Sequence, residues 1–169
     1  MSSLHLVELG TLDGDHQALL RAAQSAMSRA YNPYSDFFVG AAVGTASGKT
    51  YHGAAVENAS FGLTICAEPA AITRAYADGD VDIRSIAVVG GPAPGSSGEI
   101  VTPCGRCRQM IYEAAQVSAM DIEVLCANAD LSRVMKIGIS DLLPFAFGPR
   151  DLSLQNRIDE FVERAKRGR

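Results

Sequence analysis

The alternation of helix-periodic segments with short apolar runs is the feature that most constrains how this chain can fold. Apolar residues recur at the spacing of an amphipathic helix over residues 13–31, 65–77 and 104–117. Apolar runs bounded by turn residues predict strands over residues 37–45, 49–56, 83–89 and 121–127. Helices that alternate with strands in this order predict an α/β fold, in which helices cover both faces of a mixed sheet.

The remaining segments complete the expected organisation of the chain. A short helical turn is predicted over residues 140–143 and a charged terminal helix over residues 152–166. Residues 1–12 have no clear period and are interpreted as an N-terminal extension of uncertain order. Residues 13–169 are long enough to bury one core, so they are predicted to form a single domain.

The composition of the chain limits which binding partners and which cellular compartment are expected. The chain has 19 acidic and 15 basic residues, a formal net charge of −4, which predicts no basic face for a nucleic acid and favours a small molecule. The first ten residues do not resemble an export signal, and no stretch reaches the roughly 20 apolar residues that span a bilayer. We therefore expect a cytoplasmic protein without a membrane partner, whose four cysteines are reduced thiols or metal ligands.

Three of the four cysteines lie in two short motifs at predicted helix starts. Cys66 opens Cys-Ala-Glu, and Cys104 and Cys107 lie in Pro-Cys-Gly-Arg-Cys, with a predicted strand between the two motifs. A helix start has exposed N–H groups and a positive partial charge, which favour anionic ligands such as thiolates. Three thiolates leave the fourth position of a tetrahedral zinc ion open to water, as in a catalytic site. The motifs therefore predict zinc bound by Cys66, Cys104 and Cys107.

Glu68 follows the first predicted ligand by two residues, close to the metal without being one of its ligands. This combination is similar to the signature of zinc-dependent base deaminases, in which a zinc-bound water is the nucleophile and a nearby glutamate is general acid and base. In that scheme Glu68 takes a proton from the water and passes it to the ring nitrogen and the leaving amine.

Four ordered blocks resemble the small, homotetrameric, zinc-dependent cytidine deaminase family over about residues 15–152. The blocks are PYSDF at 33–37 with VGAA at 39–42, VENASFGLTICAE at 56–68, PCGRCRQ at 103–109 and LLPFAFG at 142–148. The resemblance implies a three-layer α/β/α sandwich, and an enzyme of pyrimidine salvage that converts cytidine or deoxycytidine to the uridine product. It also implies a homotetramer in which neighbouring subunits complete each active site.

The resemblance also assigns contacts with the substrate. By analogy, Phe37 lines the pyrimidine pocket, the backbone N–H of Ala67 meets the pyrimidine carbonyl, and Glu57 binds the ribose. Phe147 stacks on the base from another subunit. Aromatic residues also pack in cores, and a carboxylate at a strand end often caps a turn, so these residues have structural roles as an alternative.

Two positions depart from the family pattern. Ala55 stands where the family usually has an asparagine that shares the sugar 3′-hydroxyl, and a methyl group forms no hydrogen bond. Pro69 stands where the family often has an arginine that bonds the thiolates. Three thiolates give a zinc site a net charge of −1, so helix N-termini, Arg106 or Arg108 are expected to compensate it.

Other interpretations remain open on the sequence alone. Ala55 motivates the same chemistry on a different aminopyrimidine, such as a blasticidin-type antibiotic, and a zinc-binding module without catalysis is a further alternative. If Cys66, Cys104 and Cys107 do not bind a metal, they are buried core residues or include a redox pair. Cys126 lies in an apolar strand and is predicted to pack in the core. The three histidines, His5, His16 and His52, stand outside any ligand motif, so surface or capping roles are expected for them.

Overall fold

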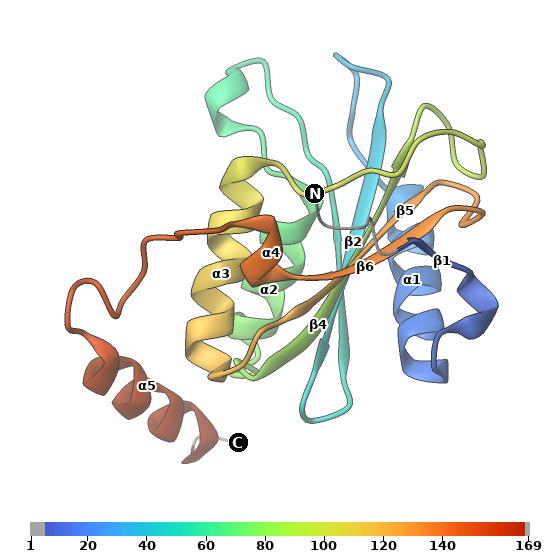
Figure 1. Ribbon diagram of the computed structural model, residues 1–169. Coiled ribbons are helices and arrows are strands. Elements are labelled where there is room, and N and C mark those ends of the chain that lie inside the picture. The colour runs from blue at the N-terminus through green and yellow to red at the C-terminus, as the bar shows by residue number, and fades with distance from the viewer. Residues whose placement is uncertain (1–5, 168–169) are drawn as a thin grey trace.

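One six-stranded mixed sheet organises the fold in the computed structural model (Figure 1). The structure describes residues 6–167. The strand order is β1-β6-β5-β4-β2-β3. The strands are β1 (Leu6–Val7), β2 (Phe38–Thr45), β3 (Thr50–Ala54), β4 (Ile83–Gly91), β5 (Glu123–Asn128) and β6 (Val134–Gly138). The helices are α1 (Gly14–Met27), α2 (Ala67–Ala77), α3 (Gly105–Ser118), α4 (Ile139–Leu142) and α5 (Gln155–Arg167), with 3-10 turns at Leu9–Thr11 and Phe61–Leu63.

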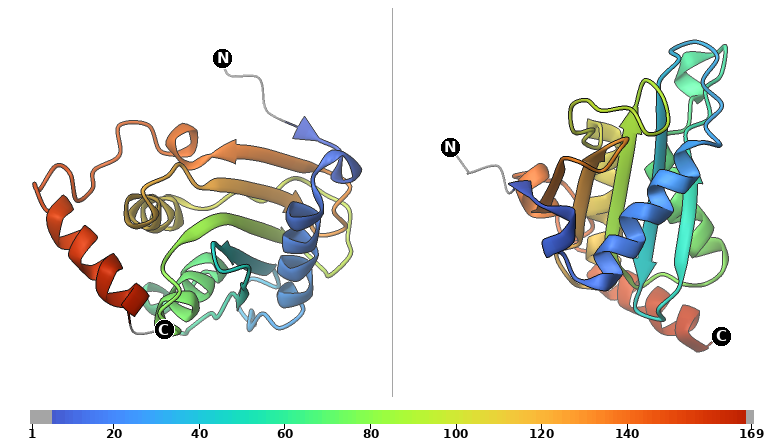
Figure 2. Two further views of the ribbon diagram at one scale, coloured as in Figure 1. Left: turned by 90° about the horizontal axis from the view of Figure 1, so that it is seen from below. Right: turned by 90° about the vertical axis from the view of Figure 1, so that its right-hand side faces the viewer.

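Helices cover both faces of the sheet, as Figures 1 and 2 show: α1 lies on one face, and α2 and α3 lie on the other. Alternate residues of β2 take part in two separate cores because side chains along a strand point to opposite faces. Ala42 packs in the core formed with α1, whereas Val43 packs in the core formed with α2 and α3. The predicted three-layer α/β/α sandwich is confirmed.

The parallel pairing of β4 with β5 determines where the site can form. Ile86 of β4 pairs with Val124 of β5, and α3 is the crossover between these strands. Both α2 and α3 run back along the sheet, so their N-termini lie at the carboxyl end of β4. In open α/β sheets this end of the strands is the usual place for a ligand site.

Gly53 permits the close approach of β3 to α2. A Cβ atom added at this position would overlap Ala67 O and come within 2.5 Å of Ala71 N, both backbone atoms of α2. We expect Gly53→Ala to lower the free energy of unfolding by about 1–3 kcal/mol, the usual cost of overpacking. Denaturant unfolding tests this, with Gly10→Ala as the control because nothing lies within 4 Å of a Cβ there.

Several segments differ from the sequence-based expectation. The first helix ends at Met27 instead of near Tyr31, because the Tyr31 backbone bonds both Ala55 and Glu57 and so cannot remain helical. Strands β1 and β6 were not predicted, and Leu6–Val7, within the expected N-terminal extension, pairs with β6. The terminal helix is found from Gln155, three residues after its predicted start. His5 lies outside the described residues.

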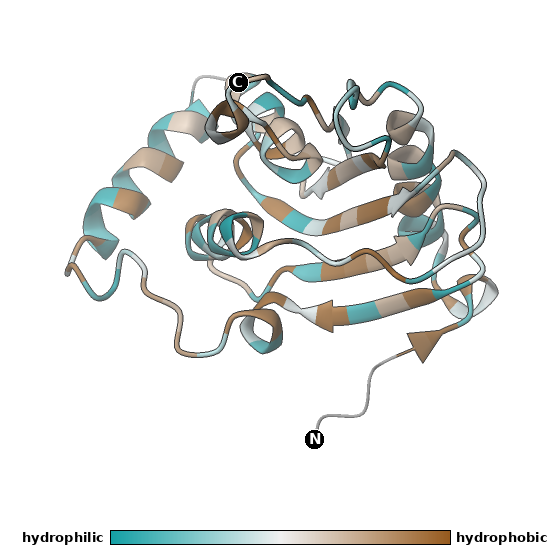
Figure 3. Cartoon of the chain, turned by 90° about the horizontal axis from the view of Figure 1, so that it is seen from above, coloured by the Kyte–Doolittle hydropathy of each residue, from teal (hydrophilic) through white to brown (hydrophobic). Residues whose placement is uncertain are grey.

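Hydropathy follows the layers of the fold. The central strands are mainly apolar in Figure 3, whereas α5 alternates between hydrophilic and hydrophobic positions and has no fully buried residue. Among residues 6–167, no helix combines the length and apolar character needed to cross a bilayer.

Candidate active site

The three cysteines of the two motifs converge, although 38 positions separate Cys66 from Cys104 (104 − 66 = 38). Cys66 is the N-cap of α2, Cys104 is the N-cap of α3, and Cys107 lies in the first turn of α3. Their sulfur atoms all lie within 4.8 Å of one another, and the Cys104 and Cys107 sulfurs are 3.5 Å apart. Sulfurs bound to one tetrahedral zinc, each at about 2.3 Å, lie about 3.8 Å apart. The cluster therefore fits zinc in both spacing and donor chemistry.

The electrostatics of the cluster favour a thiolate at Cys66. A hydrogen bond with Cys107 lowers the pKa of the Cys66 thiol to about 6, and the nearby Arg106 charge acts in the same direction. The same hydrogen bond and burial raise the pKa of the Cys107 thiol, so Cys107 is the proton donor of the pair. The cluster thus holds one easily ionised sulfur, that of the half-buried Cys66, at the N-terminus of α2.

Glu68 lies in the first turn of α2, next to the cysteine cluster, and is 3% exposed. Burial raises the pKa of its carboxyl group above the ordinary value of 4.5, and a hydrogen bond with Cys107 opposes this shift only partly. A carboxyl group whose pKa is raised holds its proton more strongly than a free carboxyl group does, which favours a role in proton transfer. Glu68 therefore has the environment of a general acid and base.

The raised pKa of Glu68 has a consequence for stability. Below pH 4.5 the carboxyl group is neutral in both the folded and the unfolded chain, and as pH rises only the folded chain must ionise a buried group. We expect metal-free Glu68→Gln to melt at a higher temperature than the metal-free parent at neutral pH. The difference should shrink towards zero as pH falls below 4.5. Melting curves across this range check the prediction, and a difference independent of pH contradicts it.

The positions expected to contact substrate differ in their exposure and in their hydrogen bonds. Ala67 is the first residue of α2, where a backbone N–H has no acceptor within the helix. Phe37, directly before β2, is 39% exposed, and Phe147, after α4, is 60% exposed. The Glu57 carboxylate accepts hydrogen bonds from the backbone N–H groups of Tyr34 (2.9 Å) and Ser35 (3.3 Å). In the free chain Glu57 therefore also caps a turn.

The two arginines proposed as charge compensation differ in their contacts. Arg108 donates to the carbonyl oxygens of Pro103 (2.8 Å) and Leu142 (3.1 Å), so its guanidinium group ties the start of α3 to α4. Arg106 donates to Thr64 O at 3.3 Å, two residues before Cys66. Pro69 is buried in the first turn of α2, where proline is tolerated. Of the two arginines, Arg106 is thus the one bonded to the segment that leads into Cys66.

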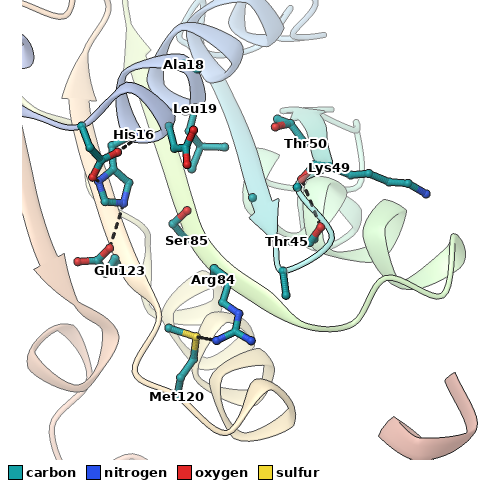
Figure 4. A pocket seen from close by; sticks show the side chains of 15 residues that line it. His16, Ala18, Leu19, Thr45, Lys49, Thr50, Arg84, Ser85, Met120 and Glu123 are labelled. Carbon is teal, nitrogen blue, oxygen red and sulfur yellow. Dashed lines mark hydrogen bonds and ion pairs between the residues drawn. The ribbon is translucent and has the colours of Figure 1, made fainter. Parts of the chain in front are cut away.

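A cavity of about 650 Å³ lies at the opposite end of the sheet and has no part in this cluster (Figure 4). It is lined at the start of β4 by Arg84 and Ser85, far from the carboxyl end where α2 and α3 begin. His16 points between two acids there, with Nδ1 2.7 Å from Asp13 and Nε2 3.0 Å from Glu123. Through these two contacts His16 joins the start of α1 to β5.

Two further residues agree with their expected structural roles. Cys126 is fully buried in β5, where burial raises the pKa of its thiol to about 12, and it is outside the metal cluster. His52 is exposed on β3, and among the described residues no histidine joins the cysteine cluster.

Fold and site together define a class of protein. An α/β/α sandwich with three converging thiols and a buried glutamate beside them is the arrangement of a zinc-dependent hydrolase that removes amino groups from nucleobases. Residues 13–122 match the sequence profile described as "Cytidine and deoxycytidylate deaminase zinc-binding region". The chain belongs to this zinc-dependent deaminase family.

Relatives and solved structures agree with that assignment. The cytidine deaminase of Halalkalibacterium halodurans is 40% identical over 139 residues, which are 82% of this chain and 98% of that protein. The cytidine deaminase of Mycobacterium tuberculosis strain H37Rv is 38% identical over 145 residues, 86% of this chain and 98% of that protein. The crystal structure of cytidine deaminase from Burkholderia pseudomallei is 42% identical, with a TM-score of 0.67, over 78% of this chain and 98% of that chain.

Proposed function

We propose that this chain deaminates cytidine or deoxycytidine, giving the uridine product and ammonia, as an enzyme of pyrimidine salvage. The observation that carries the proposal is the buried Glu68 carboxyl group beside three sulfurs that lie within 4.8 Å of one another. The relatives named above are cytidine deaminases and match most of the chain, which supports the choice of substrate.

In the proposed reaction Cys66, Cys104 and Cys107 hold the zinc ion. Zinc bound in this way supplies a Lewis acid that makes water nucleophilic at neutral pH. Glu68 accepts a proton from the attacking water, gives it to the ring nitrogen, and then assists loss of the amine. The raised pKa of its carboxyl group supports this double role, since the same group must first take and then donate a proton.

The substrate contacts are proposals of the same kind. Ala67 N–H binds the pyrimidine carbonyl, Phe37 lines the pocket, Glu57 binds the ribose, and Phe147 of another subunit stacks on the base. Glu57 would keep its contacts with the turn at Tyr34 while binding sugar, because a carboxylate accepts several hydrogen bonds. We also propose a small nucleoside as the partner, without nucleic acid, in a cytoplasmic enzyme whose catalytic domain is residues 13–169.

A substrate panel tests this proposal. Ammonia release should be fastest, by kcat/KM, with cytidine or deoxycytidine among nucleosides that differ in sugar and base. Ala55 supports one second candidate, because its methyl group cannot bond a sugar hydroxyl and favours an aminopyrimidine with an altered sugar, such as a blasticidin-type antibiotic. A higher kcat/KM for such a compound would replace the first choice. No ammonia from any of them would leave a non-catalytic zinc module.

The proposed assembly is a homotetramer with shared active sites. Large apolar side chains are exposed near the sequence blocks of the site, with Phe61 at 74%, Leu63 at 65% and Phe147 at 60% exposure, and Phe145 fully exposed. Large apolar groups exposed to this extent favour contact with another protein surface. Light scattering of the purified protein is expected to give four times the mass of one chain, and a monomer at assay concentration would contradict the shared site.

Arg106 is proposed to compensate part of the negative charge of the zinc-bound thiolates. Arg106→Ala should speed zinc release to a chelator by up to about fivefold, because exposed charge pairs contribute about 0.2–1 kcal/mol. Arg106→Lys keeps the charge, so its rate of zinc release should be close to that of the parent. Arg108→Ala should mainly lower the melting temperature, because it removes two contacts with backbone carbonyls. Equal release rates for Arg106→Ala and the parent would assign the compensation to the helix N-termini alone.

A further inference from the structure

The segment between α4 and α5 combines a fixed backbone with exposed aromatic side chains. Phe145 is fully exposed and Phe147 is 60% exposed, yet the next residues, Gly148 and Pro149, are buried. In Figure 1 this segment leaves α4 and runs out past α3 towards α5. The chain thus holds its backbone in place here while it leaves two phenylalanine rings without cover.

Gln109 of α3 is one of the groups that hold this backbone. Its side-chain Nε2 donates a hydrogen bond of 2.9 Å to the carbonyl oxygen of Phe147, across 38 positions of the sequence. The next residue is fixed as well, because Gly148 N donates to the Asp151 carboxylate at 2.7 Å. A Cβ atom at Gly148 would lie 2.7 Å from the Tyr112 ring, so the segment lies directly against α3. The peptide group between Phe147 and Gly148 is therefore fixed both at its carbonyl oxygen and at its N–H group.

Gln109 is poorly placed to serve the metal cluster of its own chain. It lies two residues after Cys107, and at 3.6 residues per turn two such positions are roughly 200° apart around a helix. Cys107 is buried towards the cluster, whereas Gln109 is exposed. The helix that carries two metal ligands on one side thus holds the backbone of Phe147 from another side.

We propose that Gln109 is a positioning residue for the active site of a neighbouring subunit, because it fixes the main chain from which Phe147 reaches that site. The inference rests on the proposed function, in which Phe147 stacks on the base bound by another copy. Stacking requires a defined ring position. Without its hydrogen bond the segment moves more freely, and the neighbour's substrate binds more weakly.

Gln109→Met tests the hydrogen bond, since methionine keeps the length of the side chain and removes the donor. KM for cytidine should rise by about 2- to 10-fold, the equivalent of one lost hydrogen bond, with kcat nearly unchanged. Zinc content should stay at the parent value, and the melting temperature should fall only slightly, because the Gln109 side chain is exposed and loses a single hydrogen bond. Gln109→Lys restores a donor and should recover most of the loss. An unchanged KM in Gln109→Met would overturn the proposal.

Mixed assemblies separate an effect on the neighbour from an effect within the chain. Chains with Gln109→Met are expressed with an excess of Glu68→Gln chains, and assemblies that contain both are isolated by separate tags. In them the active sites belong to Gln109→Met chains, but Phe147 comes from neighbours with an intact Gln109. KM should return to the parent value. A KM that stays raised would place the action of Gln109 within its own chain and refute the inference.

The same mixture with Phe147→Ala in place of Gln109→Met distinguishes this inference from the proposed function. Parent-like KM in the Phe147→Ala mixture supports the shared active site, whatever Gln109 does. If that mixture recovers and the Gln109→Met mixture does not, only the role of Gln109 fails. If neither recovers, the shared site itself is wrong.

Discussion

Glu68→Gln is expected to lower kcat for cytidine by roughly 10²- to 10⁴-fold, the usual contribution of a positioned general acid or base. Glutamine has nearly the same shape as the protonated carboxyl group and can still form hydrogen bonds. It cannot take a proton from water or give one to the ring nitrogen. Zinc content should remain near one per chain, because the three sulfurs of the metal cluster are unaltered. Ammonia release and metal analysis on one preparation provide both measurements.

A matched control is available on the terminal helix. Glu163 of α5 is exposed and pairs with Lys166 at 3.7 Å, so Glu163→Gln makes the same chemical change far from the cysteine motifs in the sequence. Its kcat should equal that of the parent. If Glu68→Gln releases ammonia at the parent rate, Glu68 moves no proton in the rate-limiting step, and the assigned mechanism is wrong.

The metal cluster and its glutamate were predictable from the sequence because the signal is local. Cys66 and Glu68 are two residues apart, and Cys104 and Cys107 are three apart, so each motif fixes its geometry within one helical turn. The convergence of the two motifs then follows from the α/β topology, which brings both helix starts to the carboxyl end of β4. The three-layer fold could be predicted in the same way, from segments with clear periods.

Features that depend on distant partners were not predictable. Strand β6 has a weak pattern of its own and forms because its backbone pairs with both β1 and β5. The end of α1 at Met27 depends on bonds from Tyr31 to a strand end that lies more than 20 residues later. The contact between Gln109 and the Phe147 backbone likewise spans 38 positions. A single sequence has no local period or motif that reports such contacts.

Cys104→Ser is expected to weaken zinc binding by at least about 100-fold, the upper range for loss of a group that only supports a ligand. A serine hydroxyl does not ionise near neutral pH and is a far poorer zinc ligand than a thiolate. The substitution changes one atom at an exposed helix N-cap, where serine is itself a favoured residue, so the fold should persist. Zinc competition with a chelator measures the affinity, and ammonia release should fall together with zinc occupancy.

Cys126→Ala supplies the contrasting case, because this cysteine is buried in β5 and stands outside the metal cluster. Its loss leaves a small cavity, so the melting temperature should fall while zinc affinity and zinc content stay unchanged. Cys104→Ser should therefore change zinc affinity with little effect on stability, whereas Cys126→Ala should change stability with no effect on zinc affinity. If Cys104→Ser retains zinc as tightly as the parent, Cys104 is not a ligand, and a site of three sulfurs cannot be what this chain uses to bind the ion.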